Sequence, residues 1–222
     1  MKRLLRMIQH LSELGLNEDT PLELRRPAIL ANRTNMVLAV VSLVYITTEW
    51  FTVTSSNEIK EFSLLVLALI FLVSFIHLFI SSLGLTHLAR IMLVLDFPVV
   101  VFLFPALTGH VGEQDFFWFP YIMVSMSIIP QLILHIRLER SLYILGCVYM
   151  FLLVIFSDEV LLNSISSRGA IVKSVEHYRF YYNRSVIVVW FFTNLIVLYL
   201  RLTAARTEAE LLALKKQSNP PV

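Results

Sequence analysis

Six long apolar runs, separated by short polar stretches, are the feature that most restricts how this chain can fold. A helix needs about 20 mainly apolar residues to cross a bilayer, and each run approaches that length. The runs are continuous rather than alternating, which disfavours an outer-membrane barrel. The sequence therefore predicts an all-α membrane protein with a bundle of six transmembrane helices, at Asn35 to about Val53, Phe62 to Leu83, about His87 to Leu107, Phe116 to Ile136, Leu138 to Phe156 and about Ser185 to Leu202.

The composition agrees with a membrane protein. Hydrophobic residues make up 57% of the chain and charged residues 15%, against about 45–50% and about 25% in soluble domains. The net charge of +2 is small and the positive residues are spread along the chain, so no nucleic-acid partner is expected. The single cysteine, Cys147, excludes an intrachain disulfide and a cysteine-built zinc site.

The distribution of lysine and arginine orients the six predicted helices. Thirteen of the 18 fall on the side that holds both termini, and such an excess marks the cytoplasmic side. The chain is thus divided into a cytoplasmic segment 1–34 with a short amphipathic helix, a six-helix transmembrane domain 35–202, and a cytoplasmic helix 203–222. The amphipathic helix is expected to lie on the cytoplasmic leaflet of the plasma membrane.

Four polar residues lie inside the predicted membrane helices, where such groups are costly and usually face the bundle interior. They are Glu49, His77, Asp96 and Asn194. Counting from the turn near Gly84 places His77 and Asp96 at similar depths on adjacent helices, and we predict that they form a pair. Two interpretations remain open: a structural clamp between two helices, or an element that responds to protons or to a ligand. Glu49 is expected to reach the outer interface.

Prolines indicate a second candidate site. Two lie in the third predicted helix and two in the fourth, at Pro98, Pro105, Pro120 and Pro130. Kinks at these positions favour a cavity that holds a lipophilic small ligand, lined by Phe102, Phe104, Trp118, Tyr121, Met123 and Met126. The alternative is that these aromatic and methionine side chains simply pack together.

A heptad-like pattern runs from the last apolar run into the polar C-terminal stretch. Its members follow one another at spacings of three and four, at Leu195, Leu198, Leu202, Ala205, Ala209 and Leu212. Such a seam is typical of a coiled coil, and neither glycine nor proline interrupts the chain from Ser185 to Ser218. We predict one continuous signalling helix that pairs in a homodimer; the alternative is an amphipathic tail that rests on the bilayer.

The approach to the first apolar run, PLELRRPAILANRTNMVLAV, carries a carboxylate, a basic pair and an asparagine, at Glu23, Arg25, Arg26 and Asn32. With the six-helix layout, this segment resembles the six-transmembrane sensor or anchor modules of bacterial membrane-bound class III nucleotide cyclases and sensor histidine kinases. The resemblance implies a receptor or anchor in a bacterial inner membrane. It also implies that an adenylate or guanylate cyclase or a kinase domain lies outside these 222 residues, and that this chain is not itself an enzyme.

Other functional classes have weaker signals. No nucleophile elbow, zinc-protease motif, phosphate-binding loop or dinucleotide fingerprint is present in the sequence, so no cofactor or metal is expected. A small six-helix transporter or channel is the main alternative, although the prolines do not fall at matching places in two halves of the chain. A membrane-embedded enzyme that uses Glu49, His77 and Asp96 is a third hypothesis.

Overall fold

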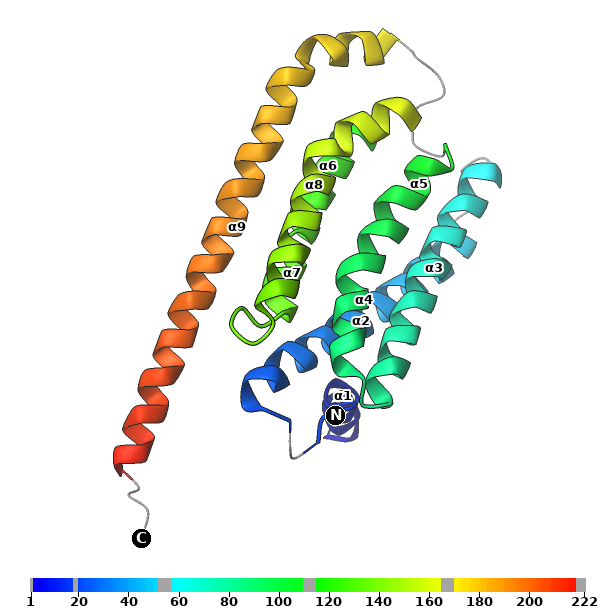
Figure 1. Ribbon diagram of the computed structural model, residues 1–222. Coiled ribbons are helices and arrows are strands. Elements are labelled where there is room, and N and C mark those ends of the chain that lie inside the picture. The colour runs from blue at the N-terminus through cyan, green and yellow to red at the C-terminus, as the bar shows by residue number, and fades with distance from the viewer. Residues whose placement is uncertain (1, 18–19, 52–56, 110–114, 165–169, 219–222) are drawn as a thin grey trace.

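The computed structural model describes residues 2–17, 20–51, 57–109, 115–164 and 170–218, and within these ranges all regular structure is helical (Figure 1). The helices, in chain order, are α1 (Lys2–Ser12), α2 (Leu22–Phe51), α3 (Asn57–Ser82), α4 (Thr86–Pro98), the π-helix η1 (Val99–Leu103), α5 (Phe104–Leu107), α6 (Asp115–Met126), α7 (Ile129–Ile133), α8 (Arg140–Ser164) and α9 (Ala170–Ser218).

Within the described ranges, five helical segments are long and apolar enough to cross a membrane. They are Leu22–Phe51, Glu61–Ser82, Thr86–Leu107, Arg140–Leu161 and Asn183–Thr207. Large apolar side chains such as Phe75, Leu145 and Phe192 are more than half exposed on their outer faces, as expected of helices whose remaining surface is covered by lipid. The prediction of an all-α, multi-pass membrane protein is confirmed.

The region predicted as the fourth membrane helix is divided in two. Helix α6 ends at Met126 and α7 begins at Ile129, because Pro130 has no N–H with which to continue the helical ladder back to Met126. The apolar segment Phe119–Ile133 is roughly 22 Å long at 1.5 Å per residue. It ends earlier than predicted, since Leu134 is already extended, with φ −104° and ψ 141°.

The third predicted helix also departs from regular geometry. Pro98 ends α4, the π-helix η1 follows, and Pro105 lies in the first turn of α5. A π-helical turn accommodates a residue that cannot join the regular ladder. The predicted kinks therefore take two different forms: a π-helical turn in one segment and an open break in the other.

Two helices extend beyond their predicted limits. Helix α2 begins at Leu22, so the boundary proposed between residues 34 and 35 lies within a continuous helix. Helix α9 begins at Ala170 and continues to Ser218, so residues 203–218 continue the membrane helix without a break. Figure 1 shows α9 along one side of the bundle, extending past the end at which α1 lies.

The described side chains form two hydrophobic clusters in the interior. One contains Phe102, Met123, Met150 and Val186, and so joins η1, α6, α8 and α9. The other is formed by Ala31, Leu93, Val94, Ile133 and Leu134, and joins α2, α4 and α7 with the residue that follows α7.

Helix α1 is fastened to the bundle at its C-terminal end. The side-chain Nδ2 of Asn32 in α2 donates hydrogen bonds to the carbonyl oxygens of Ser12 and Leu14, both at 3.1 Å. Gly15, with φ +73°, lies so close to α3 that a Cβ at this position would be 1.9 Å from the Ser81 carbonyl oxygen. Only glycine fits there, because it accepts both the positive φ and the close approach.

Candidate functional site

A polar triad connects three membrane helices. The His77 ring of α3 lies between Asn35 of α2 and Asp96 of α4, with Nδ1 3.3 Å from Asn35 Oδ1 and Nε2 3.2 Å from Asp96 Oδ2. Asn35 and His77 are fully buried, whereas the Asp96 side chain is 38% exposed. The predicted contact between His77 and Asp96 is therefore present, and Asn35 is a third member that the sequence did not indicate.

The triad restricts where protons can be placed. A neutral imidazole has one N–H and donates one hydrogen bond, whereas both ring nitrogens of His77 face an oxygen. Both contacts become hydrogen bonds when one additional proton lies on His77 or on Asp96. The Asn35 Nδ2 atom is buried and has no hydrogen-bond partner in the part of the chain that the structure describes. These contacts make the triad a structural clamp on three helices. Its response to protons or to a ligand stays a prediction.

A buried ion pair lies at the end of the bundle where α4 begins. The Arg90 guanidinium donates to both carboxylate oxygens of Glu139, with Nη1–Oε2 at 2.8 Å and Nη2–Oε1 at 2.6 Å. The two side chains are 2% and 5% exposed. Arg90 Nη1 also donates to the Ile133 carbonyl at 3.1 Å. Such bidentate, charge-assisted pairs are among the strongest hydrogen bonds in proteins.

Glu139 is the centre of this cluster. Its Oε1 is 2.6 Å from His87 Nδ1, and its Oε2 accepts a 2.7 Å hydrogen bond from the backbone N–H of His135. Burial by itself raises the pKa of this carboxyl group, but the His135 N–H and the Arg90 guanidinium outweigh burial and hold the pKa below its ordinary value. Glu139 thus remains ionised and fixes the 134–139 loop, which follows α7, against α4.

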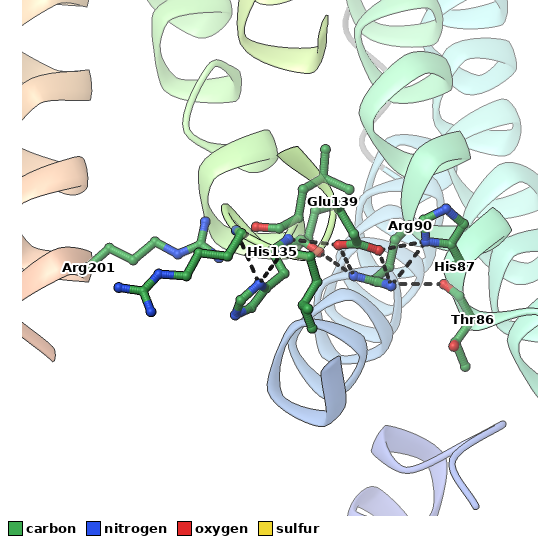
Figure 2. Close-up of polar contacts among 10 residues, drawn as sticks. Thr86, His87, Arg90, His135, Glu139 and Arg201 are labelled. Atoms are coloured by element: carbon green, nitrogen blue, oxygen red, sulfur yellow. Dashed lines mark hydrogen bonds and ion pairs between the residues drawn. The ribbon is translucent and has the colours of Figure 1, made fainter. Parts of the chain in front are cut away.

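Arg201 of α9 binds the same loop from the other side (Figure 2). Its Nη1 donates to the Gln131 carbonyl and its Nη2 to the Leu134 carbonyl, the latter at 2.6 Å. The guanidinium lies 5.9 Å from the centre of the Tyr143 ring, within the range of a cation–π contact. The 134–139 loop is consequently held between α4 and α9 by two arginines.

The intramembrane Asn194 connects α9 with the break between α6 and α7. Its Nδ2 donates to Ser127 Oγ at 2.8 Å, and its Oδ1 accepts a hydrogen bond from Gln131 Nε2. Ser127 and Gln131 are buried, and Gln131 Oε1 has no hydrogen-bond partner among the described residues. The sequence singled out Asn194 as a polar residue inside the membrane segment but did not indicate these partners, since it was interpreted as one kinked helix at Ser127.

The remaining predicted polar residue lies apart from the triad. Glu49 is half-buried near the C-terminal end of α2. It is separated from Asn35 by roughly 21 Å along the helix axis at 1.5 Å per residue. The structure therefore does not bring Glu49 together with His77 and Asp96.

The side chains predicted to line a pocket have different environments. Phe102, Met123 and Met126 are buried in one hydrophobic cluster, and the Phe104 ring stacks on Phe62 at 5.8 Å. Tyr121 is 40% exposed, and the side chain of Trp118 lies outside the described residues. An apolar groove lies between α4 and α8, lined by Ile91, Val94, Leu95, Leu134, Leu142, Leu145 and Gly146. The ligand pocket stays a prediction.

The predicted seam on α9 is open in its first half. Leu195 and Leu202 are 48% and 43% exposed, Leu198 is half-buried and Ala205 is exposed. Ala209 and Leu212 are helical, but their side chains lie outside the described residues. The seam lies next to the face of α9 that contains Asn194 and Arg201. The helix can therefore contact the bundle through Asn194 and Arg201 while the adjacent seam stays accessible to a second copy of the chain.

Two residues of the segment that resembles sensor modules fasten the N-terminal region. Arg25 donates to the carbonyl oxygens of Asn17 and Thr20, at 2.9 and 3.2 Å. Asn32 holds the end of α1, as described above. These contacts give the arginine and the asparagine of the segment a structural role.

The ring of His135 predicts a pH dependence for the loop. His135 Nδ1 accepts from the backbone N–H groups of Arg137 and Leu138, at 3.3 and 3.1 Å. Burial, and next the charge of Arg201, lower the pKa of His135 below 6.5. The folded state therefore binds this proton more weakly than the unfolded state, so stability is fully present above about pH 6.5 and falls as the pH decreases towards the lowered pKa.

Thermal unfolding in detergent between pH 5 and pH 8 measures this effect. We expect the melting temperature of the wild-type protein to fall below pH 6.5, and that of a His135→Gln variant to fall less. A His10→Gln variant, changed at an exposed histidine of α1, is the matched control and should follow the wild-type curve. Identical curves for all three proteins would contradict the assignment.

No known protein family, curated protein or solved structure matches this chain in our comparisons. Within the part of the chain that the structure describes, no three histidine, cysteine, aspartate or glutamate side chains are grouped as metal ligands.

Proposed function

We propose that this chain is a membrane receptor or anchor module that forms a homodimer and passes a signal along α9 to a cytoplasmic nucleotide cyclase or kinase domain outside these 222 residues. The observation that carries the proposal is the unbroken helix Ala170–Ser218, of 49 residues. At 1.5 Å per residue it is roughly 74 Å long, more than twice the ~30 Å hydrocarbon core of a bilayer. A rigid element of this length carries a movement from membrane to water.

The contacts of α9 support the coupling. Asn194 joins it to the α6–α7 break inside the membrane segment, and Arg201 joins it to the 134–139 loop. That loop is fixed to α4 through Glu139 and Arg90. A change in the bundle therefore reaches α9 through hydrogen bonds at two depths, without any contact beyond Arg201 being needed.

The dimer is supported by the open seam. Leu195 and Leu202 are exposed on a face that the bundle does not cover, and α9 continues past the bundle where a second copy can approach (Figure 1). The lipid bilayer is the other partner. An apolar or amphiphilic ligand that enters from the membrane is the proposed input, and this module has no catalytic role of its own.

The proposed topology has six crossings and both termini in the cytoplasm of a bacterial cell. It counts α6 and α7 together as one crossing, which is consistent with the position of α1 and the C-terminal end of α9 at the same end of the bundle (Figure 1). Exposed arginines gather towards that end, among them Arg26, Arg137 and Arg140. An excess of cations marks the cytoplasmic side.

A helical-phase experiment tests transmission. Residues 1–222 are fused to a cyclase catalytic domain, and one to seven alanines are inserted after Thr207, within α9. Each alanine turns the output by about 100° and seven restore the phase to within about 20°. We expect cyclase activity to vary periodically and to return to the wild-type level at seven insertions.

Two variants complete the test. Leu202→Pro breaks the helix and should remove the dependence on the membrane module, while Ile196→Ala, on the exposed face away from the bundle, should leave activity unchanged. Activity that is the same at every insertion length, together with an unaffected Leu202→Pro variant, would exclude transmission through α9.

A small transporter or channel is the second candidate, and the broken segment favours it. Discontinuous membrane helices with polar groups at the break form the binding sites of many transporters, and Ser127 and Gln131 lie at such a break, bonded to Asn194. Flux measurements in proteoliposomes distinguish the two candidates. Transport that is lost in a Gln131→Leu variant would support this second function over the first.

A further inference from the structure

We propose that α1 is an in-plane helix that binds the surface of a bilayer containing anionic lipids, with an apolar face at Leu5 and Ile8 and a cationic face at Arg3 and Arg6. Its orientation is the first observation. Figure 1 presents α1 down its own axis, whereas α3, α8 and α9 are seen along their lengths. Because α1 lies across the end of membrane-spanning helices, it lies parallel to the membrane surface.

The attachment of α1 fixes which face is directed at the bundle. Leu5, Ile8 and Ser12 follow at spacings of three and four and so share one face. Ser12 is fully buried, and its carbonyl is held by Asn32. The same face continues along the first turns, where Leu5 is 59% and Ile8 37% exposed. These side chains therefore point to the side of the spanning helices, where lipid surrounds the bundle.

The opposite face carries positive charge. Arg3, Arg6 and His10 also follow at spacings of three and four, and all three are exposed. On a helical projection of 100° per residue, this face is centred about 160° from the face of Leu5 and Ile8. A helix with an apolar face towards the acyl chains and arginines towards the headgroups is the arrangement of interfacial helices.

Charge complementarity indicates that α1 binds an anionic lipid surface. Each arginine near an anionic membrane surface strengthens association by about five-fold. Leu5 and Ile8 on the apolar face lie beside spanning helices that are themselves surrounded by lipid. The acyl chains of that lipid can therefore contact the apolar face of α1 without any change in the bundle. The proposal depends only on the spanning helices being in a bilayer, and the cyclase fusion results do not bear on it.

The sole cysteine makes a depth measurement direct. In a Cys147→Ala background, Ile8→Cys and His10→Cys variants of the full chain each carry one fluorophore in nanodiscs of phosphatidylcholine, with or without one-third phosphatidylglycerol. Nitroxide-labelled lipid and aqueous acrylamide are the two quenchers. We expect lipid to quench the label at position 8 and acrylamide the label at position 10, with a larger difference when phosphatidylglycerol is present.

Removing the charges tests the anionic preference. Phosphatidylglycerol should raise the ratio of membrane-bound to unbound α1 in the wild-type protein. In an Arg3→Gln, Arg6→Gln double variant, this increase should be smaller by up to about 25-fold. Acrylamide access to both positions in both bilayers would overturn the proposal. So would a label at position 8 shielded from both quenchers, which indicates a protein partner, or lipid quenching that does not depend on phosphatidylglycerol.

Discussion

Replacing Glu139 with leucine is expected to lower the free energy of unfolding by about 3–5 kcal/mol, the usual cost of removing one partner from a buried ion pair. The variant leaves the Arg90 guanidinium, 2% exposed, without its carboxylate. It also removes the acceptor of the His135 backbone N–H. Equilibrium unfolding in mixed detergent micelles, followed by circular dichroism, measures the change.

A double variant separates the loss of the pair from the loss of packing. Arg90→Met combined with Glu139→Leu replaces both charges with apolar groups of similar size, and such replacements are often neutral or stabilising. We expect the double variant to recover most of the lost stability. Arg140→Gln, at an exposed neighbour, is the control and should differ little from wild type. A double variant no more stable than Glu139→Leu would show that the pair is not the cause.

Substituting Gly15 with alanine is expected to release α1 from the bundle. The substitution carries two costs: a left-handed conformation, about 1–2 kcal/mol for a residue with a Cβ, and a Cβ placed 1.9 Å from the Ser81 carbonyl oxygen. Backbone atoms cannot rotate away as a side chain can, so the α1–α2 connection must move. Faster tryptic cleavage in α1, at Arg3 and Arg6, and a lower melting temperature report the release.

Gly84 provides a matched control for the collision. It has a similar positive φ of +82°, but a Cβ there would meet nothing within 4 Å. Gly84→Ala therefore carries only the conformational cost, and the difference between the two variants measures the close approach of Gly15 to α3. Equal melting temperatures and equal cleavage rates would contradict the packing described at Ser81.

The parts of the structure that follow from local pattern were predictable. Apolar runs are set by the thickness of the bilayer, so five of the predicted membrane helices are present with shifted ends. The contact between His77 and Asp96 was predictable because a tight turn joins α3 and α4 and fixes their register. The unbroken course of α9 followed from the absence of glycine and proline.

The parts of the structure that depend on tertiary packing could not be predicted from the sequence. The buried pair of Arg90 and Glu139 was not predicted, since nothing in the sequence relates two positions 49 residues apart. Asn35, one helical turn beyond Asn32, had no signal to distinguish it from an interfacial residue. Pro130 did give a signal, but a proline predicts a kink and a break equally well, and the buried partners of Asn194 decide between them.

The position of Arg201 restricts how α9 can move. Its guanidinium binds the Gln131 carbonyl oxygen of α7 and the Leu134 carbonyl oxygen of the loop that follows, which makes it a pivot point near the end of the bundle. Sliding α9 along its axis by one turn, about 5.4 Å, separates the guanidinium from both oxygens. A tilt of α9 centred on Arg201 keeps both hydrogen bonds. Because 17 further residues of α9 follow Arg201 to Ser218, a tilt of a few degrees displaces the C-terminal end of the helix sideways.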